Sequence, residues 1–195
     1  ARQPSPLAFN TVQGDAISNF VADGIRVRHQ VVIGPGEPED SAAFFEKAGP
    51  RQQLFFDPAK TRAAIVTCGG LCPGINNVIR SAFLELHFNY GVREVLGLRH
   101  GFRGLTEKGE PPLVLTPERV DHIHRDGGSI LSSSRGRQDT AEMVDFLVRH
   151  QINILICVGG DGTQRGTHAI AQEVIRRGLP IAVVGVPKTI DNDIQ

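Results

Sequence analysis

Tryptophan is absent from this chain of 195 residues, and tyrosine and methionine occur once each. The sequence has no apolar run long enough to cross a membrane, and its first residues lack the basic and then apolar layout of a secretory signal. These absences argue against a membrane-spanning protein. We therefore expect a soluble protein of the cytoplasm that has no membrane partner.

A net charge is also lacking, because 21 Lys and Arg residues balance 21 Asp and Glu residues. Proteins that bind nucleic acid through a general electrostatic field usually have a marked excess of basic residues. The balance therefore predicts no nucleic-acid partner. Any binding site for an anion has to be built locally.

Cysteine is scarce, and Cys68, Cys72 and Cys157 lie in or beside expected strand ends. An odd number of cysteines without paired spacing is not typical of a disulfide framework and favours a reducing compartment. Cys68 and Cys72 form a C-x3-C pair, but no second pair of Cys or His residues completes a tetrahedral zinc site. We therefore expect the cysteines to pack rather than to bind a metal.

Glycine is abundant, with 22 residues, and its distribution divides the chain into two parts. Residues 1–60 contain short mixed segments interrupted by proline and glycine, and only residues 27–33 read as a strand. Residues 61–195 alternate β-branched apolar runs with amphipathic segments. We predict an irregular N-terminal extension over 1–60 and an α/β domain over 61–195.

The second part contains regular elements throughout. The pattern predicts strands at 63–67, 95–98, 154–158 and from residue 181, and helices at 75–89, 117–125, 140–149 and 163–177. Strands that alternate with helices are typical of right-handed βαβ units and a parallel sheet. The expected fold class is α/β, a Rossmann-like three-layer α/β/α arrangement with a mostly parallel sheet.

Polar residues follow two of these strands at their carboxyl ends, where open α/β sheets bind ligands. The two tips supply three carboxylates, a lysine and two threonines: Asp161, Asp191, Asp193, Lys188, Thr163 and Thr189. Glycines beside them allow a phosphate to approach the backbone. This inventory fits phosphoryl transfer through a bound divalent metal.

Two further loops have more than one interpretation. The glycine-rich turn Cys68–Gly74 follows a strand, but its spacing matches neither Walker A nor the dinucleotide motif, so it is either a phosphate loop or a turn for close packing. Arg135 and Arg137 follow a hydroxyl-rich segment. Each is either a bidentate phosphate clamp or a solvated loop cation.

Four motifs together resemble a known family. In order along the chain they are Thr67-Cys-Gly-Gly-Leu-Cys-Pro-Gly-Ile-Asn76, Gly101-Phe-Arg-Gly-Leu105, Gly159-Gly-Asp-Gly-Thr163 and Pro187-Lys-Thr-Ile-Asp-Asn-Asp193. Their order and spacing over residues 62–195 resemble the 6-phosphofructokinases. The segment before the first strand, with Leu54-Phe-Phe-Asp-Pro58, is similar to the branch with an N-terminal extension that includes plant ATP-dependent enzymes.

The resemblance implies a function in glycolysis, the transfer of a phosphoryl group from ATP to the 1-hydroxyl of fructose 6-phosphate with Mg²⁺ as cofactor. It implies that Asp191 is the general base, that Asp161 holds the metal, and that Asp193 is a second carboxylate serving both. Further roles in catalysis or phosphate binding fall on Gly69, Gly70, Arg135, Gly159, Gly160, Gly162, Thr163, Lys188 and Thr189.

The phosphoryl donor is implied by two positions. In the family, glycine at position 162 accompanies ATP and aspartate accompanies pyrophosphate, so Gly162 favours ATP. Lys188 occurs in pyrophosphate enzymes and in the extended ATP-dependent branch. A pyrophosphate-dependent phosphofructokinase, a non-catalytic nucleotide-binding module, and a diacylglycerol- or NAD-type kinase remain the alternatives.

The resemblance also concerns the assembly. It implies that a second α/β domain and a neighbouring subunit complete the fructose 6-phosphate site. We therefore expect a homo-oligomer, either a dimer or a tetramer, and an allosteric enzyme in the intact protein. The 195 residues alone are expected to be inactive.

Overall fold

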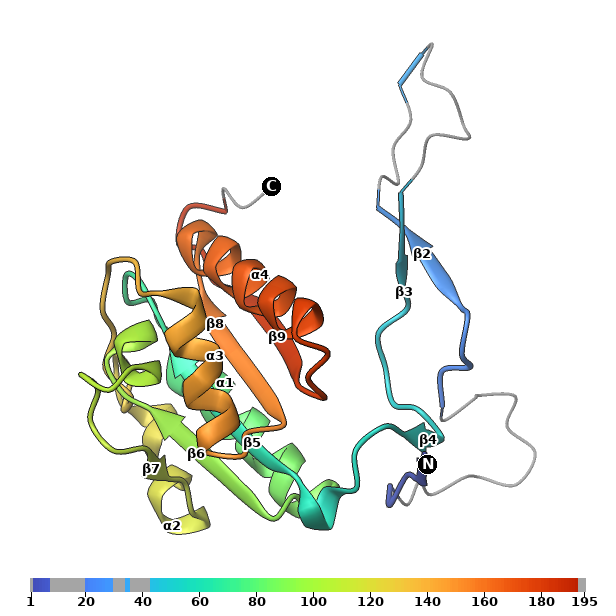
Figure 1. Ribbon diagram of the computed structural model, residues 1–195, viewed down its shortest axis with the longest axis horizontal. Coiled ribbons are helices and arrows are strands. Elements are labelled where there is room, and N and C mark those ends of the chain that lie inside the picture. The colour runs from blue at the N-terminus through green and yellow to red at the C-terminus, as the bar shows by residue number, and fades with distance from the viewer. Residues whose placement is uncertain (1, 8–19, 30–33, 36–42, 193–195) are drawn as a thin grey trace. The chain divides into compact units, whose positions relative to one another are not determined.

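The computed structural model describes residues 2–7, 20–29, 34–35 and 43–192, and the chain divides into two compact units, Ala1–Asp57 and Pro58–Gln195 (Figure 1). The first unit contains two small antiparallel sheets. In one, β1 (Gln3–Pro4) pairs with β4 (Gln53–Leu54), and in the other β2 (Arg26–Arg28) pairs with β3 (Phe44–Glu46). The strand expected at 27–33 overlaps β2, and residues 30–33 lie outside the described residues.

The second unit is built on a five-stranded sheet. Its order is β7 (Leu113–Val114), β6 (Glu94–Leu98), β5 (Arg62–Thr67), β8 (Ile154–Gly159) and β9 (Ala182–Pro187). All neighbouring pairs are parallel except β6 and β7. The mostly parallel sheet is therefore confirmed, while the short antiparallel β7 was not expected.

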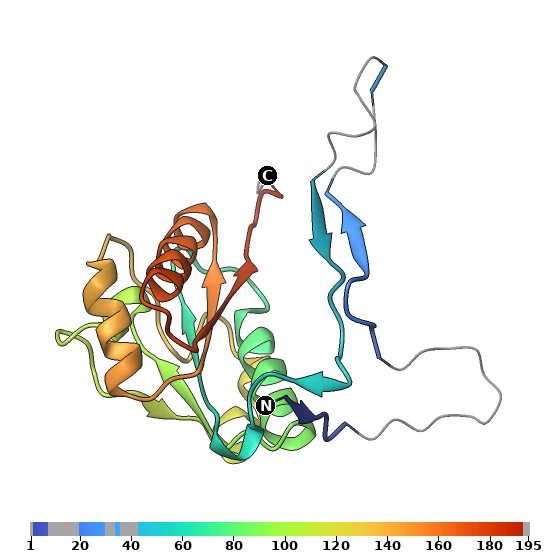
Figure 2. The ribbon, with the colours of Figure 1, turned by 45° about the vertical axis from the view of Figure 1, so that its right-hand side comes forward.

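Helices cover both faces of this sheet (Figure 2). On one face, α3 (Thr140–Arg149) and α4 (Asp161–Arg176) bury Leu147 and Ile170 against alternate residues of the central strands. On the opposite face, α1 (Ile75–Leu84) and α2 (Pro117–Val120) bury a second cluster around Phe83. The three-layer arrangement is confirmed.

Helix boundaries differ from the expected ones at three places. The segment expected at 75–89 continues beyond α1 as a π-helix at Glu85–Asn89, and the helix expected at 117–125 breaks into α2 and a 3₁₀ turn at Ile123–Arg125. The α4 helix begins at Asp161 rather than at 163. No helix among the described residues is long and apolar enough to cross a membrane.

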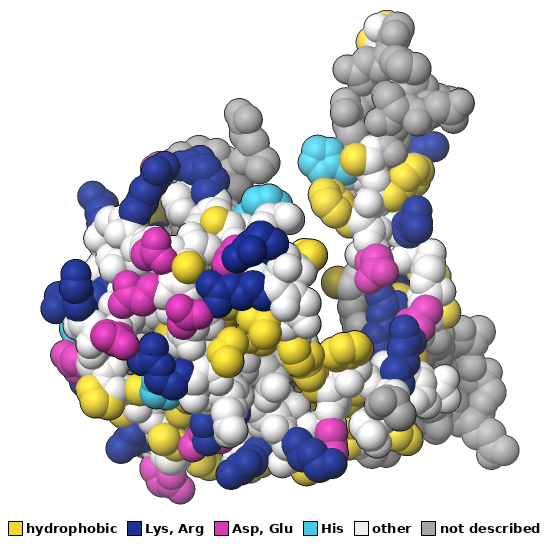
Figure 3. All heavy atoms as spheres, viewed as in Figure 1, with side chains coloured by type: hydrophobic (Ala, Val, Ile, Leu, Met, Phe, Trp, Pro, Cys, Tyr) yellow, Lys and Arg dark blue, Asp and Glu magenta, His cyan; other side chains and the backbone are white. Residues whose placement is uncertain are grey.

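The outer face of α3 and α4 presents basic and acidic side chains next to each other (Figure 3). Arg177, which follows α4, donates to Glu173 at 2.6 Å and to Asp145 of α3 at 2.5 Å. Hydrogen bonds from Arg176 and Arg177 lower the pKa of Glu173 to about 2. The bond from Arg177 to Asp145 joins α4 to α3 at the surface, and the pairs neutralise these side-chain charges within the two helices.

Gly104 offers a test of how closely the loop after β6 packs, because a Cβ at this position would lie 2.4 Å from the Arg99 carbonyl oxygen. We expect Gly104→Ala to lower the free energy of unfolding by about 1–3 kcal/mol, the usual cost of overpacking. Gly127→Ala is the matched control, since a Cβ there has no neighbour within 4 Å. Urea unfolding monitored by circular dichroism measures both. Equal stability of the two variants would contradict the prediction.

Candidate active site

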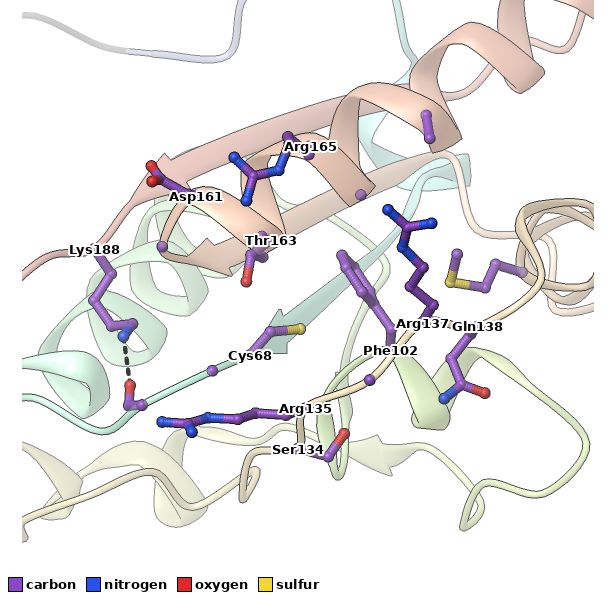
Figure 4. A pocket seen from close by; sticks show the side chains of 18 of the residues that line it. Cys68, Phe102, Ser134, Arg135, Arg137, Gln138, Asp161, Thr163, Arg165 and Lys188 are labelled. Carbon is purple, nitrogen blue, oxygen red and sulfur yellow. Dashed lines mark hydrogen bonds between the residues drawn. The ribbon is translucent and has the colours of Figure 1, made fainter. Parts of the chain in front are cut away.

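Three loops converge at the carboxyl edge of the sheet because β5, β8 and β9 are adjacent and parallel. The register places Thr67 opposite Val158 and Gly159 opposite Pro187, so the three strands end side by side. Together with the segment 134–138 and α4, these loops enclose a cavity of about 650 Å³ (Figure 4). Its wall includes Cys68, Gly70, Phe102, Arg135, Arg137, Met143, Asp161, Thr163, Arg165, Ala169 and Lys188.

The N-terminus of α4 forms one wall of the cavity. Gly160 is the N-cap residue in an extended conformation, and Asp161, Gly162 and Thr163 form the first turn. The first N–H groups of a helix have no partners within the helix, and the helix dipole favours negative charge there. Gly159 leaves room for this turn, because a Cβ on it would lie 2.3 Å from Thr163 Oγ1. The wall is therefore suited to phosphate.

Lys188 crosses the cavity. Its backbone N–H donates to the Gly159 carbonyl at 3.0 Å, which continues the pairing between β8 and β9 by one residue. Its ammonium group donates to the Gly70 carbonyl in the glycine-rich turn after β5 (Figure 4). The side chain is half-buried. Lys188 therefore fixes a positive charge between the two loops.

Arg135 lies beside the same turn, and its loop is held by backbone and hydroxyl contacts. Gly69 N–H donates to the Ser134 carbonyl at 3.2 Å, and Ser133 Oγ donates to the Gly69 carbonyl at 2.5 Å. Arg135 Nη2 would lie 3.9 Å from a Cβ on Gly70. The close packing of these two loops places the guanidinium at the edge of the cavity.

The charges that line the cavity are unbalanced. Four side chains are basic, Arg135, Arg137, Arg165 and Lys188, and one is acidic, Asp161. Such a surplus in a concave site attracts anions. A single carboxylate also suits Mg²⁺, which is commonly held by one or two carboxylates together with waters and substrate phosphates. The residues present therefore fit a metal that arrives with a polyphosphate.

The cavity wall also has apolar members. Phe102, Met143 and Ala169 line it, and Phe102 packs so closely on α4 that a Cβ on Gly166 would lie 2.5 Å from its ring. Cys68 also reaches the wall, and burial raises the pKa of its thiol to about 12, so this group stays protonated at neutral pH. The cavity wall therefore presents apolar as well as charged side chains.

A second cavity of about 580 Å³ lies beside the first. It is lined mainly by glycine and serine residues, including Gly127, Gly128, Ser129 and Ser132. The two cavities share four residues, Gly69, Gly70, Ser134 and Arg135. The two cavities therefore meet at a boundary that these four residues form.

The structure brings eight of the expected site residues to the first cavity: Gly69, Gly70, Arg135, Gly160, Asp161, Gly162, Thr163 and Lys188. Gly159 lies directly behind it at the end of β8. Thr189 and Asp191 follow β9 but line neither of these two cavities, and Asp191 is exposed. Asp193 lies outside the described residues.

Sequence reasoning missed Arg165, Phe102 and Met143 as lining residues. Arg165 lies one helical turn after Asp161, so its place follows once the start of α4 is known. Phe102 belongs to a motif that the sequence showed, but the pattern did not indicate which way its ring points. The described residues contain no group of three His, Cys, Asp or Glu side chains arranged to hold a metal.

The protein-family model and two curated relatives that match this chain are all named phosphofructokinase. The phosphofructokinase family model matches residues 62–195. An ATP-dependent 6-phosphofructokinase of Entamoeba histolytica is 49% identical over 88% of this chain and 39% of its own length. ATP-dependent 6-phosphofructokinase 7 of Arabidopsis thaliana is 44% identical over 98% of this chain and 39% of its own length. The chain spans less than half the length of these curated relatives.

Solved structures share the fold. The phosphofructokinase of Pichia pastoris in the T-state aligns with a TM-score of 0.61 and 25% identity over 68% of this chain and 16% of that chain. A pyrophosphate-dependent phosphofructokinase from Marinobacter aquaeolei aligns with a TM-score of 0.59 and 22% identity, covering 68% of this chain and 34% of that chain. At this identity the second alignment shows the fold alone.

Proposed function

Because the chain belongs to the phosphofructokinase family, we propose that the intact protein transfers a phosphoryl group from ATP to the 1-hydroxyl of fructose 6-phosphate. The observation that supports this most is the first cavity, in which a helix N-terminus, four basic side chains and one carboxylate surround the same space. The relatives named ATP-dependent 6-phosphofructokinase support the same reaction. The first cavity is then the donor site.

The extent of this cavity favours ATP over pyrophosphate. Its wall includes Phe102, Met143 and Ala169 besides the charged side chains, and apolar surface of this kind suits a nucleoside and is not needed for pyrophosphate. Gly162 supports the same donor, because a Cβ on it would have no neighbour within 4 Å and the space before the first turn of α4 stays open. A pyrophosphate-dependent enzyme is the second candidate, supported by Lys188 in the cavity wall.

The proposed mechanism places donor and acceptor on opposite sides of the boundary between the cavities. The acceptor hydroxyl approaches from the second cavity, and Asp191 accepts its proton as it attacks. Arg135 and Lys188 neutralise charge on the phosphoryl group as it crosses, and the backbone at Gly69 and Gly70 faces it. Positioning and charge neutralisation of this kind are what phosphoryl transfer mainly requires from a protein.

Asp161 is the residue that would hold Mg²⁺ in this proposal, with Asp193 as a second carboxylate. A Mg²⁺ ion held there would supply positive charge that offsets the negative charge on the donor phosphates. Gly160 and Gly162 lie on either side of Asp161 and would present backbone N–H groups to the same phosphates, whereas the Thr163 N–H donates to the Gly160 carbonyl at 2.8 Å. Thr189 would orient the reacting groups.

A coupled assay of the intact protein tests the proposed function. We expect fructose 1,6-bisphosphate to form with ATP and Mg²⁺ and to form more slowly with pyrophosphate. Faster turnover with pyrophosphate would favour the second candidate. Nucleotide binding without transfer to fructose 6-phosphate would leave a non-catalytic binding module. We further propose that the intact protein is cytoplasmic and forms a dimer or a tetramer.

Gly162 gives a sharper test of the donor. We expect Gly162→Asp to lower kcat/KM for ATP at least tenfold, because an added carboxylate in the first turn of α4 repels the nucleotide phosphates. Gly162→Asn is the matched control, since it adds nearly the same volume without the charge. Steady-state kinetics with ATP as the varied substrate measures both. An aspartate variant that performs as well as the asparagine variant would remove charge as the reason for the donor preference.

A further inference from the structure

Gln164, the fourth residue of α4, connects the ends of two strands through its side chain. Its amide nitrogen Nε2 donates to the Gly159 carbonyl at 2.8 Å and to the Val186 carbonyl at 3.1 Å. Gly159 is the last residue of β8, and Val186 is the last but one of β9. The half-buried side chain therefore spans the edge at which both strands pass into loops.

Gly185 provides the space that this contact needs. A Cβ on Gly185 would lie 2.2 Å from Gln164 Oε1, closer than any real contact of this kind. The amide therefore lies directly over the bare backbone of β9, with its NH₂ group toward the two carbonyl oxygens. The amide has to face this way, because both partners are acceptors and only the NH₂ group donates. The position of the Gln164 amide therefore depends on the absence of a side chain at Gly185.

The two connected loops hold the groups that the proposed reaction needs on either side of the phosphoryl group. Asp161 and the first turn of α4 follow β8, while Lys188 and Asp191 follow β9. The main-chain bond from Lys188 N–H goes to the same Gly159 carbonyl, one residue after the end of β9. The side chain of Gln164 adds a second connection beside this main-chain bond.

We infer that Gln164 is a positioning residue that fixes the loop bearing Asp161 relative to the loop bearing Lys188 and Asp191. The inference rests on the proposed function, since it concerns the relative placement of donor and base in that reaction. Gln164 itself does not line the donor cavity. Its loss therefore changes the alignment of reacting groups more than the contacts that bind ATP.

Two substitutions separate donation from shape. Gln164→Met keeps the length of the side chain and removes its donors, and Gln164→Glu keeps the shape but presents only acceptors to two carbonyl oxygens. We expect kcat in the intact protein to fall about 10-fold to 100-fold, the range for misplacement on the scale of 1 Å. The glutamate variant should have the lower kcat of the two. KM for ATP should change less than about threefold, because the first turn of α4 and its cations remain.

A third variant tests the same contact without altering Gln164. Gly185→Ala should displace the amide and lower kcat by a similar factor. In the double variant Gln164→Ala/Gly185→Ala the losses should not add, because the alanine methyl group occupies the space left by the amide. Circular dichroism and the melting temperature of each variant give the folded fraction at the assay temperature, and kcat is expressed per folded molecule.

The outcomes separate this role from the proposed function. A lower kcat per folded molecule with nearly constant KM for ATP, together with non-additive losses, supports the positioning role. An unchanged kcat in the methionine and glutamate variants, beside an active unsubstituted protein, overturns it while leaving the proposed function in place. A loss of activity that follows only the folded fraction also overturns it. An unsubstituted protein without transfer activity would overturn both.

Discussion

Replacing Arg135 with glutamine should lower kcat in the intact protein about 10²-fold to 10³-fold, the usual effect of removing one group that stabilises charge in a transition state. Arg135 lines both cavities and lies beside the glycine turn at their boundary, so its guanidinium is placed to meet a phosphoryl group in transit. Arg135→Lys should recover only part of the loss, because an ammonium group lacks the planar fork that binds two phosphate oxygens.

The matched control for Arg135 is its near neighbour Arg137, which lines the first cavity but not the second. Arg137→Gln should raise KM for ATP with little change in kcat, because the interaction it loses is the same in the bound donor and in the transition state. Steady-state kinetics with ATP and fructose 6-phosphate varied in turn separates the two constants. Equal losses of kcat in both variants would show that Arg135 stabilises the transition state no more than Arg137 does.

Replacing Asp191 with asparagine should lower kcat about 10²-fold or more, the usual range for loss of a general base, with a smaller change in KM. Asp191 lies close behind Lys188 in the loop after β9, and its side chain is exposed. It lines neither cavity, so the proposed role requires its contact with the acceptor hydroxyl to form when fructose 6-phosphate binds, as the hydrogen bonds of a general base often do.

Asp121→Asn is the control for Asp191. It removes an exposed carboxylate that pairs with His122 and lines neither cavity, so kcat should stay unchanged. Single-turnover kinetics with excess protein shows whether the affected step in Asp191→Asn is the transfer itself. An undiminished rate of transfer in that variant would end the assignment of Asp191 as the base.

The strands and their polar tips could be predicted because both are local features of the sequence. A β-branched run followed by glycine and acid residues is enough to predict β8 and the loop after it, and parallel order then brings its tip beside that of β9. Asp161, Thr163 and Lys188, which belong to these tips, consequently line one cavity. Gly69, Gly70 and Arg135 line it as well, but the local pattern left their role open and only the family resemblance implied it.

Features that depend on distant parts of the chain could not be predicted in this way. The role of Gln164 requires knowledge that β9 has a bare backbone at Gly185 and that α4 begins at Asp161. Strand β7 has only two residues, too few for an alternating pattern. In the first unit, β1 pairs with β4 across about fifty residues of sequence, a separation at which turn and periodicity signals contain no information.

The bond from the Lys188 ammonium group to the Gly70 carbonyl has a consequence for the entropy of binding. A lysine side chain loses about 1.5–2 kcal/mol of rotamer freedom when it is fixed in one position. In this protein that loss occurs on folding, when the side chain settles across the cavity. An ammonium group has three donors, so two remain for an anion while the third stays with Gly70. Binding of a phosphate therefore does not have to fix the Lys188 side chain, because folding has already fixed it. The loss of side-chain entropy consequently does not weaken the affinity for the phosphate.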